Sequence, residues 1–303
     1  MSLVLAAAMF AAACTSEPSG DGPVATGASP GTGASPSATG PAPEPVQAED
    51  FDPANFSDSA TVDHRLFPLV PGTRYTYEGS VLEDGERVGR SIVITVTDLT
   101  KEIAGVQTAV SWDLDYDEGD LVEAELAFFA QDDEGNVWRI GEYPEEYDGG
   151  KFDKAPAWFH GLEGATAGIV IRASPQAGEP GYAQGFAPKP VGFDDRGRTY
   201  EVGASTCVPV DCYDDVVIIE EFEPSKPGAF QLKYYAPDVG NVRVGWRGRN
   251  EKERERMVLV RLERLTPEEL LEVREQAFAL ERSGYRRSDV YAQTSPAVPL
   301  SFS

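Results

Sequence analysis

Alternating apolar and polar positions begin near residue 50 and recur in short runs as far as residue 265. In SIVITVT, residues 91–97, the side chains of Ile92, Ile94 and Val96 fall on one face, and residues 106–116 continue the alternation. A period of two residues is typical of a strand with one buried face. Further runs of this kind occupy residues 121–130, 137–143, 215–223, 230–236, 241–247 and 257–265. The pattern predicts a mainly β domain.

Turn residues separate these runs, as in DDEGN at residues 132–136. The connections are too short for crossover helices, so neighbouring strands should run antiparallel. Residues 144–203 are richer in Gly, Pro and aromatic residues and less periodic, and there we expect long loops with short strands. We predict one domain over residues 51–288, built as a curved antiparallel sheet in the form of a half-barrel or a sandwich meander.

One helix is expected at the end of this domain. Thr266, Pro267 and Glu269 form a capping box, with Thr266 as the N-cap. Apolar residues follow at helical spacing, and Gly284 is a residue type that ends helices. We therefore predict a helix over residues 266–284 that packs on the sheet, and a loose tail over residues 289–303. The apolar stripe consists of Leu270, Val273, Ala277 and Leu280.

The N-terminal region differs in composition from the rest. Residues 2–13, SLVLAAAMFAAA, are apolar and end at Cys14. This run resembles the lipobox of bacterial lipoproteins, which implies that residues 1–14 are a signal peptide. It also implies that Cys14 carries lipid, such as palmitate, and holds the protein extracytoplasmically on the bacterial cell membrane. An ordinary secretory signal is the alternative. Residues 15–50 are rich in Ser, Gly, Pro and Ala and are expected to form a disordered tether.

The other two cysteines, Cys207 and Cys212, lie close together in TCVPVDC. Export favours a disulfide between them, and a metal-binding pair is the alternative. The 51 acidic residues exceed the 26 basic residues and give a net charge of -25. This balance argues against nucleic acid as a partner, because binding phosphates requires a basic surface. Solubility or adaptation to salt explains such a charge, and cation binding is the functional alternative.

Three aspartates alternate along one predicted strand, so Asp113, Asp115 and Asp117 share a face. They suggest a calcium site, although Ala124 stands where an EF-hand loop requires Glu. The alternative is a solvated acidic strand face. No other cofactor is expected.

Three stretches resemble a widespread set of uncharacterised bacterial secreted proteins and lipoproteins. They are FPLVPGTRYTYEG at residues 67–79, AQDDEGNVWRIGE at residues 130–142 and KYYAPDVGNVRV at residues 233–244, and residues 158–171 share the likeness. The resemblance implies an export signal and a β-rich domain, and it implies no established reaction.

These observations leave three hypotheses for function. The first is non-catalytic binding of an apolar or amphipathic ligand, or of an envelope protein. Aromatic side chains would then line the pocket, although core packing is the plainer explanation of these rings. The second is an envelope glycan or ester hydrolase that uses carboxylates such as Glu142 and Glu220. The third is a calcium-stabilised surface module. His64 and His160 are read as polar loop residues. The candidate pocket residues are Trp112, Phe129, Trp138, Trp158, Tyr234 and Trp246.

Overall fold

The structure, a computed structural model, describes residues 48–83 and 85–300. The chain divides into a unit of residues 1–45 and a unit of residues 46–303, and the described residues belong to the second. The predicted signal run, Cys14 and most of the predicted tether lie outside the described residues. They therefore remain predictions.

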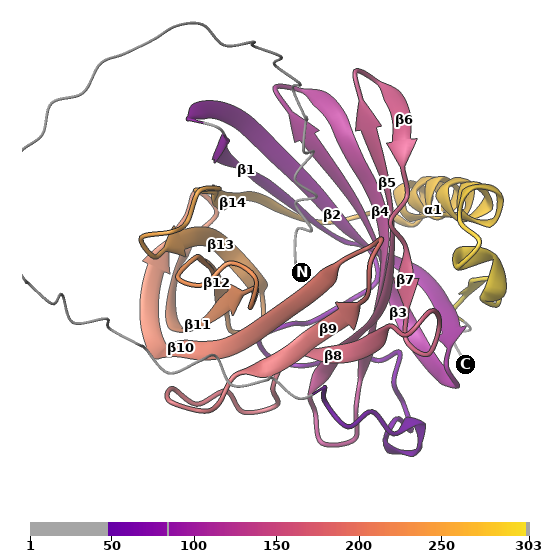
Figure 1. Ribbon diagram of the computed structural model, residues 1–303, viewed down its shortest axis with the longest axis horizontal. Coiled ribbons are helices and arrows are strands. Elements are labelled where there is room, and N and C mark those ends of the chain that lie inside the picture. The colour runs from indigo at the N-terminus through magenta and orange to yellow at the C-terminus, as the bar shows by residue number, and fades with distance from the viewer. Residues whose placement is uncertain (1–47, 84, 301–303) are drawn as a thin grey trace, which may run out of the picture. The chain divides into compact units, whose positions relative to one another are not determined.

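The described residues fold into a mainly β unit with one long helix (Figure 1). Almost every run with a two-residue period is a strand, which confirms the predicted fold class. The strands are β1 (Thr73–Glu83), β2 (Glu86–Ile103), β3 (Val106–Asp117), β4 (Asp120–Gln131), β5 (Val137–Asp148), β6 (Lys151–Lys154), β7 (Trp158–Phe159), β8 (Thr166–Ile171), β9 (Tyr182–Ala187), β10 (Phe193–Cys207), β11 (Cys212–Phe222), β12 (Phe230–Ala236), β13 (Gly240–Arg247), β14 (Arg256–Arg264) and β15 (Val298–Pro299). The helices are α1 (Pro267–Arg287) and the 3-10 turns η1 (Pro53–Asn55) and η2 (Tyr291–Gln293).

The sheet closes on itself. Its strands follow the order β1-β14-β13-β12-β11-β10-β9-β8-β5-β4-β3-β2, and β1 also pairs with β2, from Arg74 opposite Thr95 to Glu83 opposite Glu86. Twelve strands therefore form a closed antiparallel barrel, and β6 and β7 pair with β5 beside it. The predicted curved sheet is thus a complete barrel. Its long strand β10 was not apparent from the irregular middle of the sequence.

The outer face of β2–β5 is apolar and covered. Alternate residues of these strands, including Val110, Leu126 and Phe128, belong to the main hydrophobic cluster. Ala277 and Leu280 of α1 join the same cluster, and α1 packs on β2 and β4 (Figure 1). Successive side chains of a strand point to opposite faces of the sheet. Since α1 covers the outer face, the alternate side chains of the same strands point into the barrel.

Helix α1 begins as predicted and ends later. Thr266 and Glu269 form the reciprocal capping box, and Val273, Ala277 and Leu280 are buried. The helix continues through Gly284 to Arg287, so the prediction that Gly284 ends it is wrong. A Cβ on Gly284 would lie 2.9 Å from the Tyr291 ring, so this glycine permits close packing in place of a cap.

No helix within residues 48–83 and 85–300 has the length and the apolar character that a membrane crossing requires.

The tail after α1 is held against the barrel between Tyr291 and Leu300, so the expected loose segment is wrong for this part, and residues 301–303 lie outside the described residues. Tyr291 is fully buried among Tyr143, Phe159 and Tyr285. Further along, Val298 of β15 pairs with Thr100 of β2.

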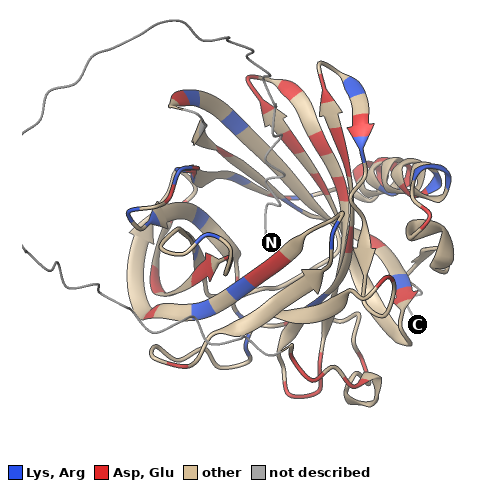
Figure 2. Cartoon of the chain, viewed as in Figure 1, with Lys and Arg blue, Asp and Glu red and all other residues tan. Residues whose placement is uncertain are grey.

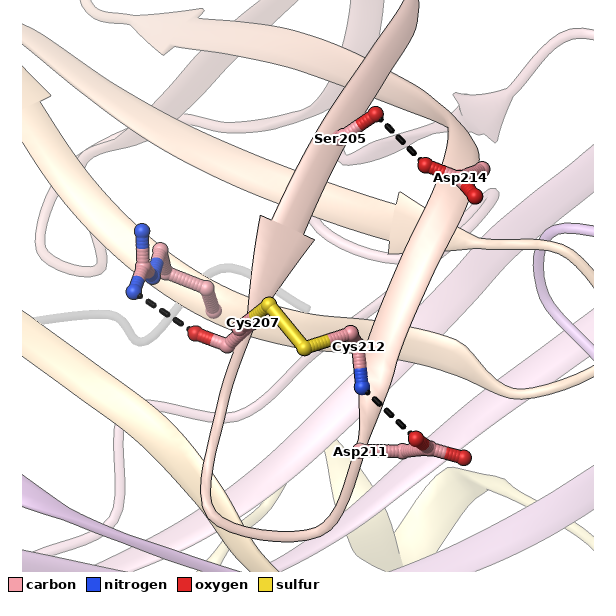
Figure 3. Close-up of a disulfide and its surroundings, with 6 residues drawn as sticks. Ser205, Cys207, Asp211, Cys212 and Asp214 are labelled. Carbon is pink, nitrogen blue, oxygen red and sulfur yellow. Dashed lines mark hydrogen bonds between the residues drawn. A yellow bond between two sulfur atoms is a disulfide. The ribbon is translucent and has the colours of Figure 1, made fainter.

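A disulfide joins Cys207 and Cys212, as the sequence predicts (Figure 3). The two cysteines are opposite each other at the end of the β10–β11 hairpin. Ser205 Oγ donates to Asp214 Oδ1 at 2.7 Å, two residues further along each strand, and Arg243 Nη2 donates to the Cys207 carbonyl at 3.0 Å. The bond therefore fixes the tip of a hairpin that β13 also holds.

Candidate functional site

The inner faces of β3 and β4 carry carboxylates. Asp113 and Asp115 on β3, and Glu123 and Glu125 on β4, alternate with residues of the outer cluster. Figure 2 shows acidic positions gathered on these strands and on β5. We refer to these four side chains as the acidic wall. A solvated acidic face was the plain expectation for β3, but Asp113 and Asp115 are 5% and 8% exposed, so that expectation is wrong.

The strand register places these like charges opposite one another. Asp113 is paired with Glu125, and Asp115 with Glu123. On the next strand, Glu146 of β5 is paired with Glu123. Residues directly opposite in an antiparallel pair have Cβ atoms about 4.5–5.5 Å apart, and like charges there are destabilising. The acidic wall therefore opposes folding whenever its members are all ionised.

Burial shifts the pKa of every member of the wall upward. It raises the pKa of Asp113 to about 7, and it raises the pKa values of Asp115, Glu123 and Glu125 well above their ordinary range. Repulsion between neighbouring carboxylates adds to the effect of burial. The wall therefore retains protons near neutral pH and gives them up when a positive charge approaches.

Arg139 lies beside the acidic wall on the inner face of β5, where it is paired with Phe129 of β4. Its Nη1 is 2.6 Å from Glu142 Oε1, and the other oxygen of Glu142 accepts a hydrogen bond of 2.8 Å from Trp158 Nε1. Trp158 stacks on Phe193 with ring centroids 5.0 Å apart, and the Arg139 guanidinium lies 5.9 Å from the centre of the Phe129 ring. This group combines one neutralised ion pair with three aromatic surfaces.

A second polar group lies on the strands β9, β11 and β12. Lys233 is fully buried, and its Nζ is 4.0 Å from Glu221 Oε2. Gln184 donates from Nε2 to Glu221 Oε1 at 3.2 Å. Among the described residues, the buried interior atoms without a hydrogen-bond partner include the Tyr235 hydroxyl, Asp113 Oδ1, Lys233 Nζ and Arg139 Nε. Unpartnered buried polar atoms are uncommon, so each requires an explanation, and a water or a bound ligand is one.

The three stretches singled out in the sequence, residues 67–79, 130–142 and 233–244, meet at this interior group. Phe67 of the first stretch packs on Phe129 and on Tyr235, with ring centroids 5.3 and 6.1 Å away. Tyr77 of the same stretch donates from its hydroxyl to the Asn241 carbonyl of the third stretch at 2.8 Å. The second stretch supplies Arg139 and Glu142 to the same interior.

The turn of the second stretch has a structural explanation. Asp132 accepts hydrogen bonds from the Glu134 and Asn136 backbone N–H groups at 3.0 and 2.8 Å, and from Trp138 Nε1 at 2.7 Å. Its residues DEGNVW thus fold around one carboxylate. Trp138 is thereby held on the outer side of β5, where its ring meets Phe51.

The six predicted pocket residues do not gather in one place. Phe129 and Trp158 face the interior beside Arg139, whereas Trp112 and Trp138 pack in the outer cluster. The remaining two have cationic neighbours, since Arg243 lies 5.8 Å from the Tyr234 ring and Arg254 lies 4.7 Å from the Trp246 ring.

The predicted calcium ligands are divided between two roles. Asp117 accepts two hydrogen bonds from Arg90, at 2.8 and 2.9 Å, whereas Asp113 and Asp115 belong to the acidic wall. Arg90 also lies 3.5 Å from Glu255, and its pKa is raised because these carboxylates outweigh the effect of burial. Within the described residues, no three His, Cys, Asp or Glu side chains are arranged to hold a metal ion.

The two carboxylates considered for hydrolysis, Glu142 and Glu220, are both paired with arginine side chains. They lie on opposite sides of the barrel wall. Glu142 is held by Arg139 and Trp158 inside. Glu220 is held by Arg198 and Arg247, whose guanidiniums lie over the Phe230 ring on the outer face. Neither is a free acid or base, and they do not face a common position.

The two histidines form hydrogen bonds with backbone groups. His64 Nε2–H donates to the Arg172 carbonyl at 3.1 Å, and its Nδ1 accepts from the Leu66 N–H at 3.1 Å. His160 Nδ1 accepts from the Ala167 N–H at 2.9 Å. Burial lowers the pKa of both rings, which is consistent with neutral structural residues.

A cavity of about 320 Å³ lies beside the His64 loop. It has mixed walls, with apolar groups from the loop and from β10 and β11 and one side chain of each charge. Its lining residues are His64, Arg65, Leu66, Ala173, Val202, Gly203, Asp215, Val217 and Pro237.

Reasoning from the sequence did not identify Arg139, Glu125, Lys233 or Tyr235 as site residues. A usable signal existed in two runs, VWRIGEY and FQLKYYA, where one cation lies within a mostly apolar strand. A lone cation in such a strand, with apolar residues on both sides, indicates a buried charge that requires a partner.

Comparison with known proteins finds two similar solved structures. No family model matches the chain, and no curated protein is similar to it in sequence. The chain is similar to a Bacteroides fragilis crystal structure, provisionally named an exported protein with YmcC-like fold, with 13% identity and a TM-score of 0.41. It is also similar to a provisionally named lipoprotein of Parabacteroides distasonis, with 14% identity and a TM-score of 0.37. Each match covers 66% of this chain and 99% of the other.

Proposed function

We propose that the protein is an exported, lipid-anchored binding protein that holds an amphipathic ligand inside its barrel and catalyses no reaction. The observation that carries this proposal is the interior group of Arg139, Glu142 and Trp158 next to the acidic wall, where buried polar atoms lack partners. Aromatic surfaces and charged groups on one concave wall are what an amphipathic ligand requires.

The size of the barrel supports an interior site. Barrel diameter grows with strand number, and about eight strands enclose just enough space for side chains or for one small ligand. This barrel has twelve strands. Its outer apolar face is already covered by α1, so the interior is the better candidate for binding.

The engagement of the carboxylates supports binding over hydrolysis. Glycoside hydrolysis requires two carboxyl groups facing one bond, one of them free to donate a proton. Glu142 and Glu220 are both paired with arginines on opposite faces. We therefore place hydrolysis second, and a screen against glycosides and esters would detect it.

Native mass spectrometry of the full-length protein extracted from membranes tests the proposal. We expect a bound small molecule, or binding of an added probe with a phenylbutyl body. Ala127→Phe, on the inner face of β4, should block binding, whereas Val202→Phe, on the wall of the cavity near His64, should not. Near-ultraviolet circular dichroism confirms that each variant is folded. A ligand-free spectrum and no probe binding would overturn the proposal, and loss of binding only in Val202→Phe would move the site to the cavity.

The location has its own test. The apolar run that ends at Cys14, and a disulfide between the other two cysteines, support export and anchoring. Cys14→Ala should release the protein from membranes, and unchanged retention would contradict the lipid anchor.

A further inference from the structure

We infer that the acidic wall binds an organic ammonium group, and that the apolar body of the same ligand lies against Trp158, Phe193 and Phe129. The inference deepens the proposed function and rests on it. It assigns the ligand a chemical class, namely a cation with an attached aromatic or aliphatic body.

Charge balance inside the barrel is the first argument. Arg139 pairs with Glu142 and also acts on Glu125, Lys233 pairs with Glu221, and Arg90 pairs with Asp117 and Glu255 and also acts on Asp115. Glu146, which is next to the acidic wall but not part of it, pairs with Lys154 at 3.1 Å. The four carboxyls of the acidic wall thus outnumber the cations near them, and they repel one another across two strands. A ligand that brings a positive charge relieves this repulsion, whereas an anion increases it.

Unpartnered buried atoms are the second, independent argument. Asp113 is 5% exposed and Tyr235 is fully buried, yet Asp113 Oδ1 and the Tyr235 hydroxyl have no hydrogen-bond partner among the described residues. Arg139 Nε and Lys233 Nζ also make no hydrogen bond there, but each of these cations already lies beside a carboxylate, Glu142 or Glu221. A carboxylate oxygen only accepts hydrogen bonds, and an ammonium group only donates them. The unpartnered oxygen of Asp113 therefore suits an ammonium.

The aromatic rings distinguish an organic cation from a metal ion. The rings of Trp158 and Phe193 stack with their centroids 5.0 Å apart, and a hydrogen bond to Glu142 fixes the Trp158 indole. Aromatic faces bind organic cations and apolar bodies. As noted above, the described residues offer no set of three ligands for a metal ion.

Three probes with one body and different charges test the inference. They are 4-phenylbutylammonium, 4-phenylbutanol and 4-phenylbutanoate, titrated by isothermal calorimetry into the full-length protein in detergent. We expect the ammonium to bind at least about tenfold more tightly than the alcohol, which corresponds to about 1.4 kcal/mol, and the carboxylate to bind most weakly.

Two variants and a control locate the effect. Glu123→Gln combined with Glu125→Gln should remove the preference for the ammonium and leave binding of the alcohol unchanged. Asp113→Asn should weaken the preference alone and serves if the double variant does not fold. Asp120→Asn, an exposed position on the same strand, is the matched control and should behave as the wild type.

The outcomes separate this inference from the proposed function. Equal affinities for all three probes, or tightest binding of the carboxylate, would overturn the ammonium inference and support an interior site of another class. Unchanged preference in the wall variants would overturn it as well. Failure of every probe would also overturn it, and native mass spectrometry would then judge the proposed function separately.

Discussion

Lys101 on β2 and Glu281 on α1 form a buried ion pair, with Lys101 Nζ 3.0 Å from Glu281 Oε1. The Lys101 ammonium also donates to the Tyr285 hydroxyl at 3.2 Å and to the Ser295 carbonyl, and it lies 4.4 Å from the centre of the Tyr291 ring. One side chain thus joins the barrel, the helix and the tail.

Lys101→Met should therefore destabilise the protein strongly. Removing one partner of a buried pair leaves an uncompensated charge, at a cost of about 3–5 kcal/mol. Urea unfolding would measure it. The double variant Lys101→Met with Glu281→Gln should recover part of the loss, and a single-variant loss below about 1 kcal/mol would contradict this role for the pair.

The acidic wall should make the protein less stable as pH rises. The folded-state pKa of Asp113 is raised from 3.8 to about 7, so between these values the folded state holds a proton that the unfolded state releases. The free energy of unfolding should then fall across this window by up to about 1.4 kcal/mol per pH unit for one group. Melting temperatures from pH 4 to 8 would show the fall.

Two Asp→Asn variants, which change charge but not size, test this pH dependence. Asp113→Asn should reduce the slope and raise the melting temperature at pH 8, because the repulsion with Glu125 is removed. Asp120→Asn should keep the wild-type slope. A rise in stability with pH in the wild type would show that the wall is not protonated in the folded state.

Gly141→Ala should destabilise the protein. A Cβ at Gly141 would lie 2.5 Å from Phe159 Cδ1 and 2.7 Å from the Trp158 carbonyl, where β7 pairs with β5. Such overpacking typically costs about 1–3 kcal/mol. The same change at Gly245, where a Cβ would meet only Tyr234 at 3.7 Å, should be tolerated. Thermal unfolding compares the two, and equal effects would contradict the close approach of β7.

Replacing both cysteines should have a modest effect. The bond between Cys207 and Cys212 spans a sequence separation of 5, and closing so small a loop stabilises a protein by about 2 kcal/mol. We expect Cys207→Ser with Cys212→Ser to lower the free energy of unfolding by about that amount and to leave probe binding unchanged. Loss of binding would show that the hairpin tip contributes to the site.

Local patterns were sufficient to predict most elements of the fold. Ile92, Ile94 and Val96 are buried on one face of β2, and Thr266 caps α1 as its neighbours predict. These features depend on residues within one turn or one strand. Closure of the barrel depends on Tyr75 and Tyr77 of β1 meeting β2 and β14 at once, and no local pattern encodes that pairing.

The site was less predictable because both faces of β3 are covered. Trp112 and Leu114 suggested the buried face, and Asp113 and Asp115 suggested the solvated one. The helix covers the first face and the barrel encloses the second, so acidic residues became buried. Only the pairing of β3 with β4, which sets Asp113 opposite Glu125, reveals the conflict of charge.

Closure of the ring has a consequence for self-association. Since β1 bonds to both β2 and β14, the twelve strands within residues 73–264 that the structure describes leave no long unpaired margin on which a second chain could add a strand. The short β6 beside it, KFDK, begins and ends with lysine, a residue that discourages edge-to-edge aggregation. We therefore expect folded copies of this domain to resist edge-to-edge pairing even where they crowd together.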